Sequence, residues 1–127
     1  MADLFDKTTR ALGASLTLRQ TRNNVISSNI ANAETPNYQA KKMDFENALA
    51  RALDVEDQGG VAANAIGRVG AEIYENPDVS VNNDGNTVDM DKEMASLAEN
   101  SLMYKAAIQL INKKMATLKY AATDGGR

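Results

Sequence analysis

Apolar and small residues recur at alternating steps of four and three along the C-terminal third of the chain. The series consists of Met90, Met94, Leu97, Ser101, Tyr104, Ile108, Ile111, Met115, Leu118 and Ala122. This spacing is typical of a heptad seam on a helix that packs against another helix, and it continues here for more than four heptads. No proline or glycine interrupts it. We therefore predict a helix from Asp89 to about Ala122 that buries one stripe against a partner helix.

A similar recurrence at about seven residues predicts a first long helix from Asp3 to about Ala33. This helix should end before Pro36, because the residue before a proline is pushed out of the helical region. About 55 residues separate the two helices, which is enough for an antiparallel return. We expect the pair to form an intrachain seam from Phe5, Leu12, Ile26, Ile30, Met94, Leu97, Tyr104, Ile108, Ile111, Met115 and Leu118.

The second long helix also carries apolar residues away from this seam, at Leu102, Met103, Ala106 and Leu110. One partner helix cannot cover both stripes. These residues are either scattered surface positions, which are normal, or a second interface with neighbouring subunits. We favour the interface, because the four residues are neighbours on one helix face.

The polar stretch that follows the first helix predicts a sharp turn at Thr35, Pro36, Asn37 and Tyr38. Proline suits the second position of such a turn, and asparagine tolerates positive φ at the third. The side chains of Asn29 and Asn32 are expected to bond nearby backbone as the helix ends.

The middle of the chain predicts short and irregular elements. Lys41 to Leu53 has the spacing of a short amphipathic helix, with Asp44 as its N-cap. The residues from Asp54 to Gly70 have no period and are interpreted as a linker. Ala71 to Asp89 contains alternating valines and an Asp-Gly pair, which predict a small β-hairpin.

Part of this last segment partially mimics a calcium-binding loop, with Ser80, Asn82, Asp84, Gly85 and Asp91 at matching positions. The first position lacks the usual aspartate, and the twelfth lacks the bidentate glutamate. We interpret the segment as a turn and expect no metal or other cofactor.

Composition excludes several function classes. The chain has 127 residues, no histidine and no cysteine, so it lacks the commonest general base and the usual transition-metal ligands. The acidic cluster Asp54, Glu56 and Asp57 has no apolar surroundings to raise a pKa, and we interpret it as solvated loop charge. A net charge of −3 gives no basic footprint for nucleic acid. We predict a non-enzymatic, mainly α protein with no small-molecule substrate.

The whole chain is expected to form one domain. Residues 1–35 supply the N-terminal core helix, residues 36–88 the turn, short helix, linker and hairpin, and residues 89–127 the C-terminal core helix. The two long helices should pack as an antiparallel coiled-coil-like pair.

Two motifs resemble those of the bacterial flagellar axial proteins, the family of rod and hook subunits. The first, here called the turn motif, is Ser-Ser-Asn-Ile-Ala-Asn-Ala-Glu-Thr-Pro-Asn-Tyr at residues 27–38. It includes Ala31 within the Asn-Ile-Ala-Asn pattern, and Asn37 stands where the family usually has glycine. The second, here called the pre-helix motif, is Asp-Gly-Asn-Thr-Val-Asp-Met-Asp-Lys-Glu-Met at residues 84–94. The resemblance covers roughly residues 3 to 122. It is strongest to the proximal rod proteins, because the pre-helix motif and the stretch Lys-Lys-Met-Asp-Phe at residues 41–45 look most like theirs.

The resemblance implies a structural subunit of the flagellar basal-body rod. It implies export through the flagellar type III apparatus, which agrees with an N-terminus that lacks the features of a cleavable signal. It also implies polymerisation into the axial drive shaft in the periplasmic space. The implied partners are other rod proteins, the rod-to-ring adaptor, the MS-ring protein and the export gate. The alternative is a soluble helical adaptor or secretion chaperone that acts as a cytoplasmic dimer.

Overall fold

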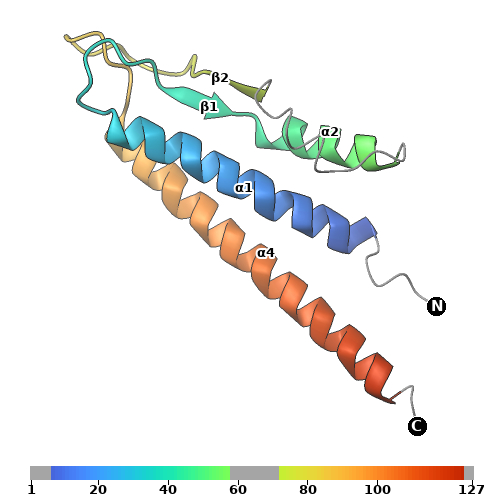
Figure 1. Cartoon of the computed structure of the whole chain (residues 1–127). Coiled ribbons are helices and arrows are strands. Elements are labelled where there is room, and N and C mark those ends of the chain that lie inside the picture. The colour runs from blue at the N-terminus through green and yellow to red at the C-terminus, as the bar shows by residue number, and fades with distance from the viewer. Residues whose placement is uncertain (1–6, 58–71, 125–127) are drawn as a thin grey trace.

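The computed structural model describes residues 7–57 and 72–124. Along the chain lie α1 (Lys7–Ala31), β1 (Lys41–Met43), α2 (Phe45–Asp57), β2 (Ile73–Glu75) and α4 (Met90–Asp124). Figure 1 shows α1 in the middle, with α4 on one side and the layer of β1, β2 and α2 on the other. The prediction of a mainly helical chain with two packed terminal helices and a small two-stranded antiparallel element is confirmed.

The two long helices end where local chemistry favours it. At the start of α4 the carboxylate of Asp89 accepts a hydrogen bond from the backbone N–H of Lys92 at 3.2 Å, which satisfies one of the unpaired donors of the first turn. Helix α1 ends at Ala31, ahead of Pro36 as the sequence predicts. At 35 residues, α4 is longer than α1 at 25.

The short elements differ from their predicted positions. Residues 41–43 form a strand instead of the first turn of a helix, and α2 begins at Phe45 and continues to Asp57. Asp44 still caps α2, since its carboxylate accepts from the N–H of Asn47 at 3.1 Å. The first residues assigned to the linker are therefore helical, and residues 58–70 lie outside the described part of the chain.

The small antiparallel sheet joins segments that are far apart in the sequence. Strand β1 pairs with β2, with Lys41 opposite Glu75 and Met43 opposite Ile73. Within residues 72–89, the described part of the expected hairpin, β2 is the only strand, so the hairpin does not form there. The pairing partner of β2 comes from the other side of α2, so the sheet is held by long-range contacts that no local pattern encodes.

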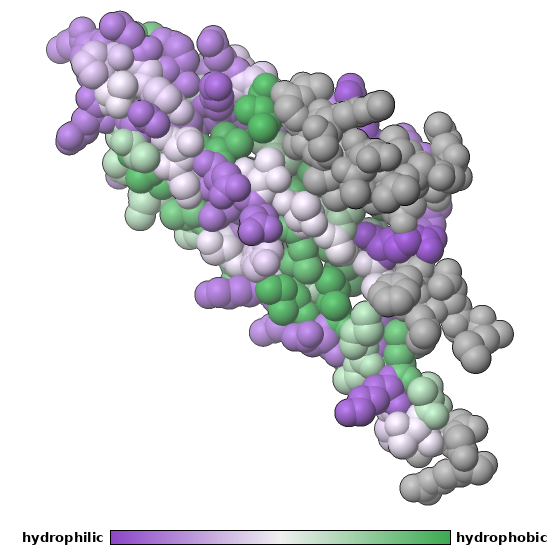
Figure 2. All heavy atoms as spheres, in the orientation of Figure 1, coloured by the Kyte–Doolittle hydropathy of each residue, from purple (hydrophilic) through white to green (hydrophobic). Residues whose placement is uncertain are grey.

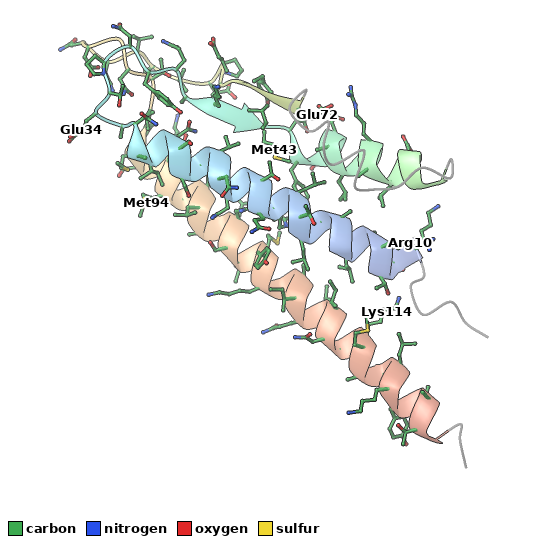
Figure 3. The ribbon with its side chains drawn as sticks, in the orientation of Figure 1. Arg10, Glu34, Met43, Glu72, Met94 and Lys114 are labelled. Atoms are coloured by element: carbon green, nitrogen blue, oxygen red, sulfur yellow. The ribbon has the colours of Figure 1, made fainter. Side chains whose placement is uncertain are left out.

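The apolar core lies on the side of α1 that faces the sheet and α2. Leu18, Met43 and Ala48 form its centre, and Phe45, Leu49 and Ile73 pack against them. Figure 3 shows Met43 on β1, the strand that lies alongside α1. The core is therefore built by α1 with the middle of the chain, whereas polar residues share the contact between α1 and α4.

Candidate functional site: an asparagine clasp and an exposed face of α4

Asn86 joins the two sequence motifs at one end of the molecule. Its side-chain amide donates to the carbonyl oxygens of Asn32 at 2.8 Å and of Thr35 at 2.7 Å. Its side-chain oxygen accepts from the N–H of Val88 at 2.7 Å. The side chain is 0% exposed, so these bonds replace water entirely. A single residue of the pre-helix motif thus holds the backbone of the turn motif.

Further hydrogen bonds connect the same two segments. The hydroxyl of Thr87 accepts from the N–H of Ala40 at 2.8 Å, and the N–H of Thr87 donates to the carbonyl of Tyr38 at 3.1 Å. The N–H of Asn37 donates to the carbonyl of Asp84 at 3.0 Å. We call this set of contacts between residues 29–41 and residues 84–93 the asparagine clasp.

Two residues of the clasp have left-handed backbone conformations and lie against each other. Asn37 has a φ of 61° and Gly85 a φ of 80°. A Cβ atom on Gly85 would clash with the side-chain oxygen of Asn37. The positive φ therefore favours glycine at position 85, and a side chain there would also have to displace the exposed side chain of Asn37.

Asn29 extends the clasp to the start of α4. Its amide group pairs with the backbone of Lys41, accepting from the N–H at 3.0 Å and donating to the carbonyl at 2.7 Å. It also donates to the carboxylate of Glu93 at 3.1 Å. Burial raises the pKa of the Glu93 carboxyl, the hydrogen bond from Asn29 opposes this, and the charge of Asp89 reinforces it.

The other predicted turn residues have smaller roles. The amide of Asn32 donates to the carbonyl of Ser28 at 2.8 Å, and its side-chain oxygen accepts from the hydroxyl of Thr35 at 3.1 Å. Ala31 and Pro36 are exposed and Tyr38 is half-buried. The sequence predicted local bonds for these side chains but not that Asn86 would bond the same turn.

The contact stripe of α4 is rotated relative to the predicted seam. Leu97, Tyr104, Ile111 and Leu118 are half-buried, whereas Met94 is 51% exposed and Met115 is also exposed. Figure 3 shows Met94 on the outer side of α4, pointing away from α1. The buried positions are instead Glu93, Asn100 and Ala107, each one residue before a position of the predicted series. The remaining predicted seam residues Leu12, Ile26, Ile30 and Ile108 are half-buried or buried, and Phe5 lies outside the described residues.

The rotation places polar side chains in the seam, and each of them has a hydrogen-bond partner there. The amide of Asn100 donates to the backbone carbonyl of Arg19 at 2.8 Å. The guanidinium of Arg19 lies 4.2 Å from the centre of the Phe45 ring, a cation–π distance. Burial, with a smaller contribution from Arg22, lowers the pKa of Arg19. The polar seam residues Glu93 and Asn100 were missed because heptad analysis follows apolar positions.

One face of α4 carries uncovered apolar side chains. Leu102 is 68% exposed and Leu110 is 55% exposed, and Met103 and Ala106 are exposed beside them. Leu110 also lines an apolar groove of about 420 Å³ together with Leu12 of α1. Figure 2 shows the end with the turns as mostly hydrophilic, and hydrophobic residues gathered along the helical part. The assignment of this face to an intersubunit interface stays a prediction.

Within residues 7–57 and 72–124, no three acidic residues gather where they could hold a metal ion. The residues that partially mimic a calcium loop form a tight turn instead, in which Gly85 donates to the carbonyl of Asn82 at 2.9 Å. Over the same described residues, no helix has the length and apolar character needed to cross a membrane.

Comparison with known proteins identifies the family. A family model described as flagella basal body rod protein matches residues 11–39. The flagellar basal body rod protein FlgB of Cereibacter sphaeroides is 42% identical, over 84% of this chain and 86% of that protein. The chain belongs to the FlgB family of flagellar basal body rod proteins. FlgB of Escherichia coli is 36% identical over 98% of this chain and 99% of its own length, and FlgB of Bacillus subtilis is 35% identical over 96% and 98%.

The part of this FlgB-family chain matched by the family model contains most of α1 and the turn half of the clasp. The pre-helix motif lies beyond that match but within the span shared with the relatives from E. coli and B. subtilis. The clasp therefore joins a segment that the family model describes to one that it does not.

Proposed function

We propose that this chain is a structural subunit of the flagellar basal-body rod that is exported by the flagellar type III apparatus and polymerises into the axial drive shaft. The names of its relatives support the rod assignment. The single structural observation that carries the polymerisation step is the uncovered apolar face of α4, formed by Leu102, Met103, Ala106 and Leu110. A long helix with apolar residues on a second face gains stability when neighbouring subunits cover it.

Folding and assembly are coupled in this proposal. The apolar core of Leu18, Met43 and Ala48 lies between α1, the small sheet and α2. The far half of α4 has few buried residues, and most of the stability of a helix in a protein comes from tertiary packing. A chain that is only partly stable alone can pass through a narrow export channel and gain its remaining stability from subunit contacts.

The proposed partners are other rod proteins, the rod-to-ring adaptor, the MS-ring protein and the export gate. The proposed location is the rod in the periplasmic space. Contacts between successive subunits would be heterologous, so that one face of each subunit meets a different face of the next and the polymer stays open.

The test is a charge on the uncovered face. Leu110→Glu in a strain that lacks the wild-type gene should leave export into the periplasm intact, because export does not require the assembled form. Rod formation should fail, because an unpaired carboxylate buried at an interface costs about 3–5 kcal/mol. Asn112→Glu is the matched control, since this exposed residue lies on a different flank of α4.

Export is measured in periplasmic fractions, and completed basal bodies are counted by electron microscopy. Normal basal bodies with Leu110→Glu would contradict the second interface. If the purified chain is then also a stable dimer by sedimentation, the better account is the alternative, a soluble helical adaptor or secretion chaperone in the cytoplasm.

A further inference from the structure

A pocket with a cationic rim lies where α1, β1 and the first turns of α4 meet, with a volume of about 360 Å³. Its lining includes four basic residues from these three elements, Arg22, Lys41, Lys42 and Lys92. The pocket is distinct from the uncovered face of α4, which takes no part in its lining. We call it the cationic pocket.

Most of this positive charge is not neutralised by ion pairs within the described part of the chain. Lys42 pairs with Asp78 at 3.8 Å, and both side chains are largely exposed, so the pair is weak. Arg22, Lys41 and Lys92 form no ion pair with any residue in the described part of the chain. The second carboxylate in the lining, Glu93, already accepts a hydrogen bond from Asn29. The lining therefore carries an excess of positive charge in a chain whose net charge is −3.

Part of the lining of the cationic pocket is apolar, and we call this part the floor. Val25 and Ile26 of α1 and Met43 of β1 contribute to it, and the side chains of Ile26 and Met43 are almost fully buried. A site with an apolar floor and a charged rim suits a ligand that combines aliphatic groups with the opposite charge. A ligand of inorganic phosphate size would leave the floor unused.

We propose that the cationic pocket binds an acidic peptide segment of a partner protein, with carboxylates at Arg22, Lys41 and Lys92 and an aliphatic side chain on the floor. The concave shape favours a peptide over an anionic membrane, because a flat lipid surface cannot reach the floor while contacting the rim. This binding is a property of the folded chain and is independent of the rod assembly proposed above.

The test uses the full chain and a short synthetic peptide rich in glutamate with interspersed leucine. Binding is followed by fluorescence anisotropy of the labelled peptide and by backbone amide shifts of the isotope-labelled chain. The reference probes are the same peptide with every glutamate replaced by glutamine, and vesicles that contain anionic lipid. The variants are Lys92→Glu and Lys41→Glu, with Arg22→Gln as a milder change and Lys119→Glu as a control of equal charge on exposed α4 surface.

The expected result is shift changes around the cationic pocket and a loss of affinity of about tenfold for each charge reversal there, since like charge replaces attraction. Lys119→Glu and the glutamine peptide separate specific binding from general attraction: the first should leave the affinity unchanged, and the second should not bind. Circular dichroism of each variant checks that its helices remain.

Three results would overturn the proposal. These are equal peptide affinity in wild type and in both folded charge-reversal variants, equal weakening by Lys119→Glu, and tighter binding of the vesicles than of the peptide with the same dependence on the pocket lysines. Failure of this test leaves the Leu110→Glu experiment unaffected, because the two surfaces share no residue.

Discussion

Replacing Asn86 by alanine should destabilise the chain strongly, because this buried side chain makes two hydrogen bonds to the turn motif and a third to Val88 within its own motif. The change removes one of the two donors from each of the carbonyls of Asn32 and Thr35, which keep the backbone N–H groups of Thr35 and Tyr38 as partners. It leaves the buried N–H of Val88 without the side-chain oxygen that it bonds. Each lost bond costs about 1 kcal/mol, and the unsatisfied buried N–H of Val88 adds to this, so the expected loss is about 3–4 kcal/mol. That is a large part of the 5–15 kcal/mol that is typical of a folded domain.

The measurement is urea unfolding followed by helical circular dichroism, with wild type and variants in one buffer. Asn86→Asp is a shape-matched variant that keeps the acceptor for Val88 but places a carboxylate against two carbonyl oxygens, and it should lose at least as much stability. Asn83→Ala is the control, because Asn83 is exposed in the same turn, and it should stay within about 0.5 kcal/mol of wild type. An Asn86→Ala variant as stable as Asn83→Ala would refute the clasp as the link between the motifs.

Other changes should have smaller or conditional effects. Gly85→Ala should lower the free energy of unfolding by about 1–3 kcal/mol, because of strain at positive φ and contact with Asn37. The loss should be smaller in an Asn37→Gly background, and equal losses in both backgrounds would contradict the contact. Because burial raises the pKa of Glu93, the stability of the wild type falls as pH rises through the folded-state pKa of this carboxyl. Glu93→Gln should therefore melt at a higher temperature than wild type at about pH 7 and not at about pH 4. In hydrogen exchange of the isolated chain, amides 116–123 should exchange faster than amides 97–107 because they have few buried neighbours; the opposite order would contradict coupled folding and assembly.

The long helices could be predicted from the sequence because their signals are local and repeated. Heptad spacing extends over many turns, and the signals at Asp89 and Pro36 mark where α4 begins and where α1 must already have ended. The positions of β1 and β2 could not be predicted in this way. Each strand has three residues, and the partner of each lies across α2, so only the folded chain brings them together.

The two halves of the clasp could be predicted from the sequence, but the contact between them could not. Both motifs were recognised separately, and Asn37 was expected at positive φ, as the structure shows. The contact between the two motifs was not predicted, because the bonds from Asn86 to Asn32 and Thr35 connect residues more than fifty positions apart. The rotation of the α4 stripe was missed for a related reason. Glu93 and Asn100 count as polar in any periodicity, and only their buried partners make them seam residues.

The polar seam residues also affect how the helix pair responds to mechanical load along its axes. Two helices joined only by apolar side chains could slide by one heptad and recover most of their burial. Here such a shift would take Asn100 from the carbonyl of Arg19 and Glu93 from the amide of Asn29, leaving buried polar groups unpaired. The hydrogen bonds of these two residues therefore fix the register of α1 against α4. A force along one helix is then transmitted to the other, because sliding would break these buried bonds.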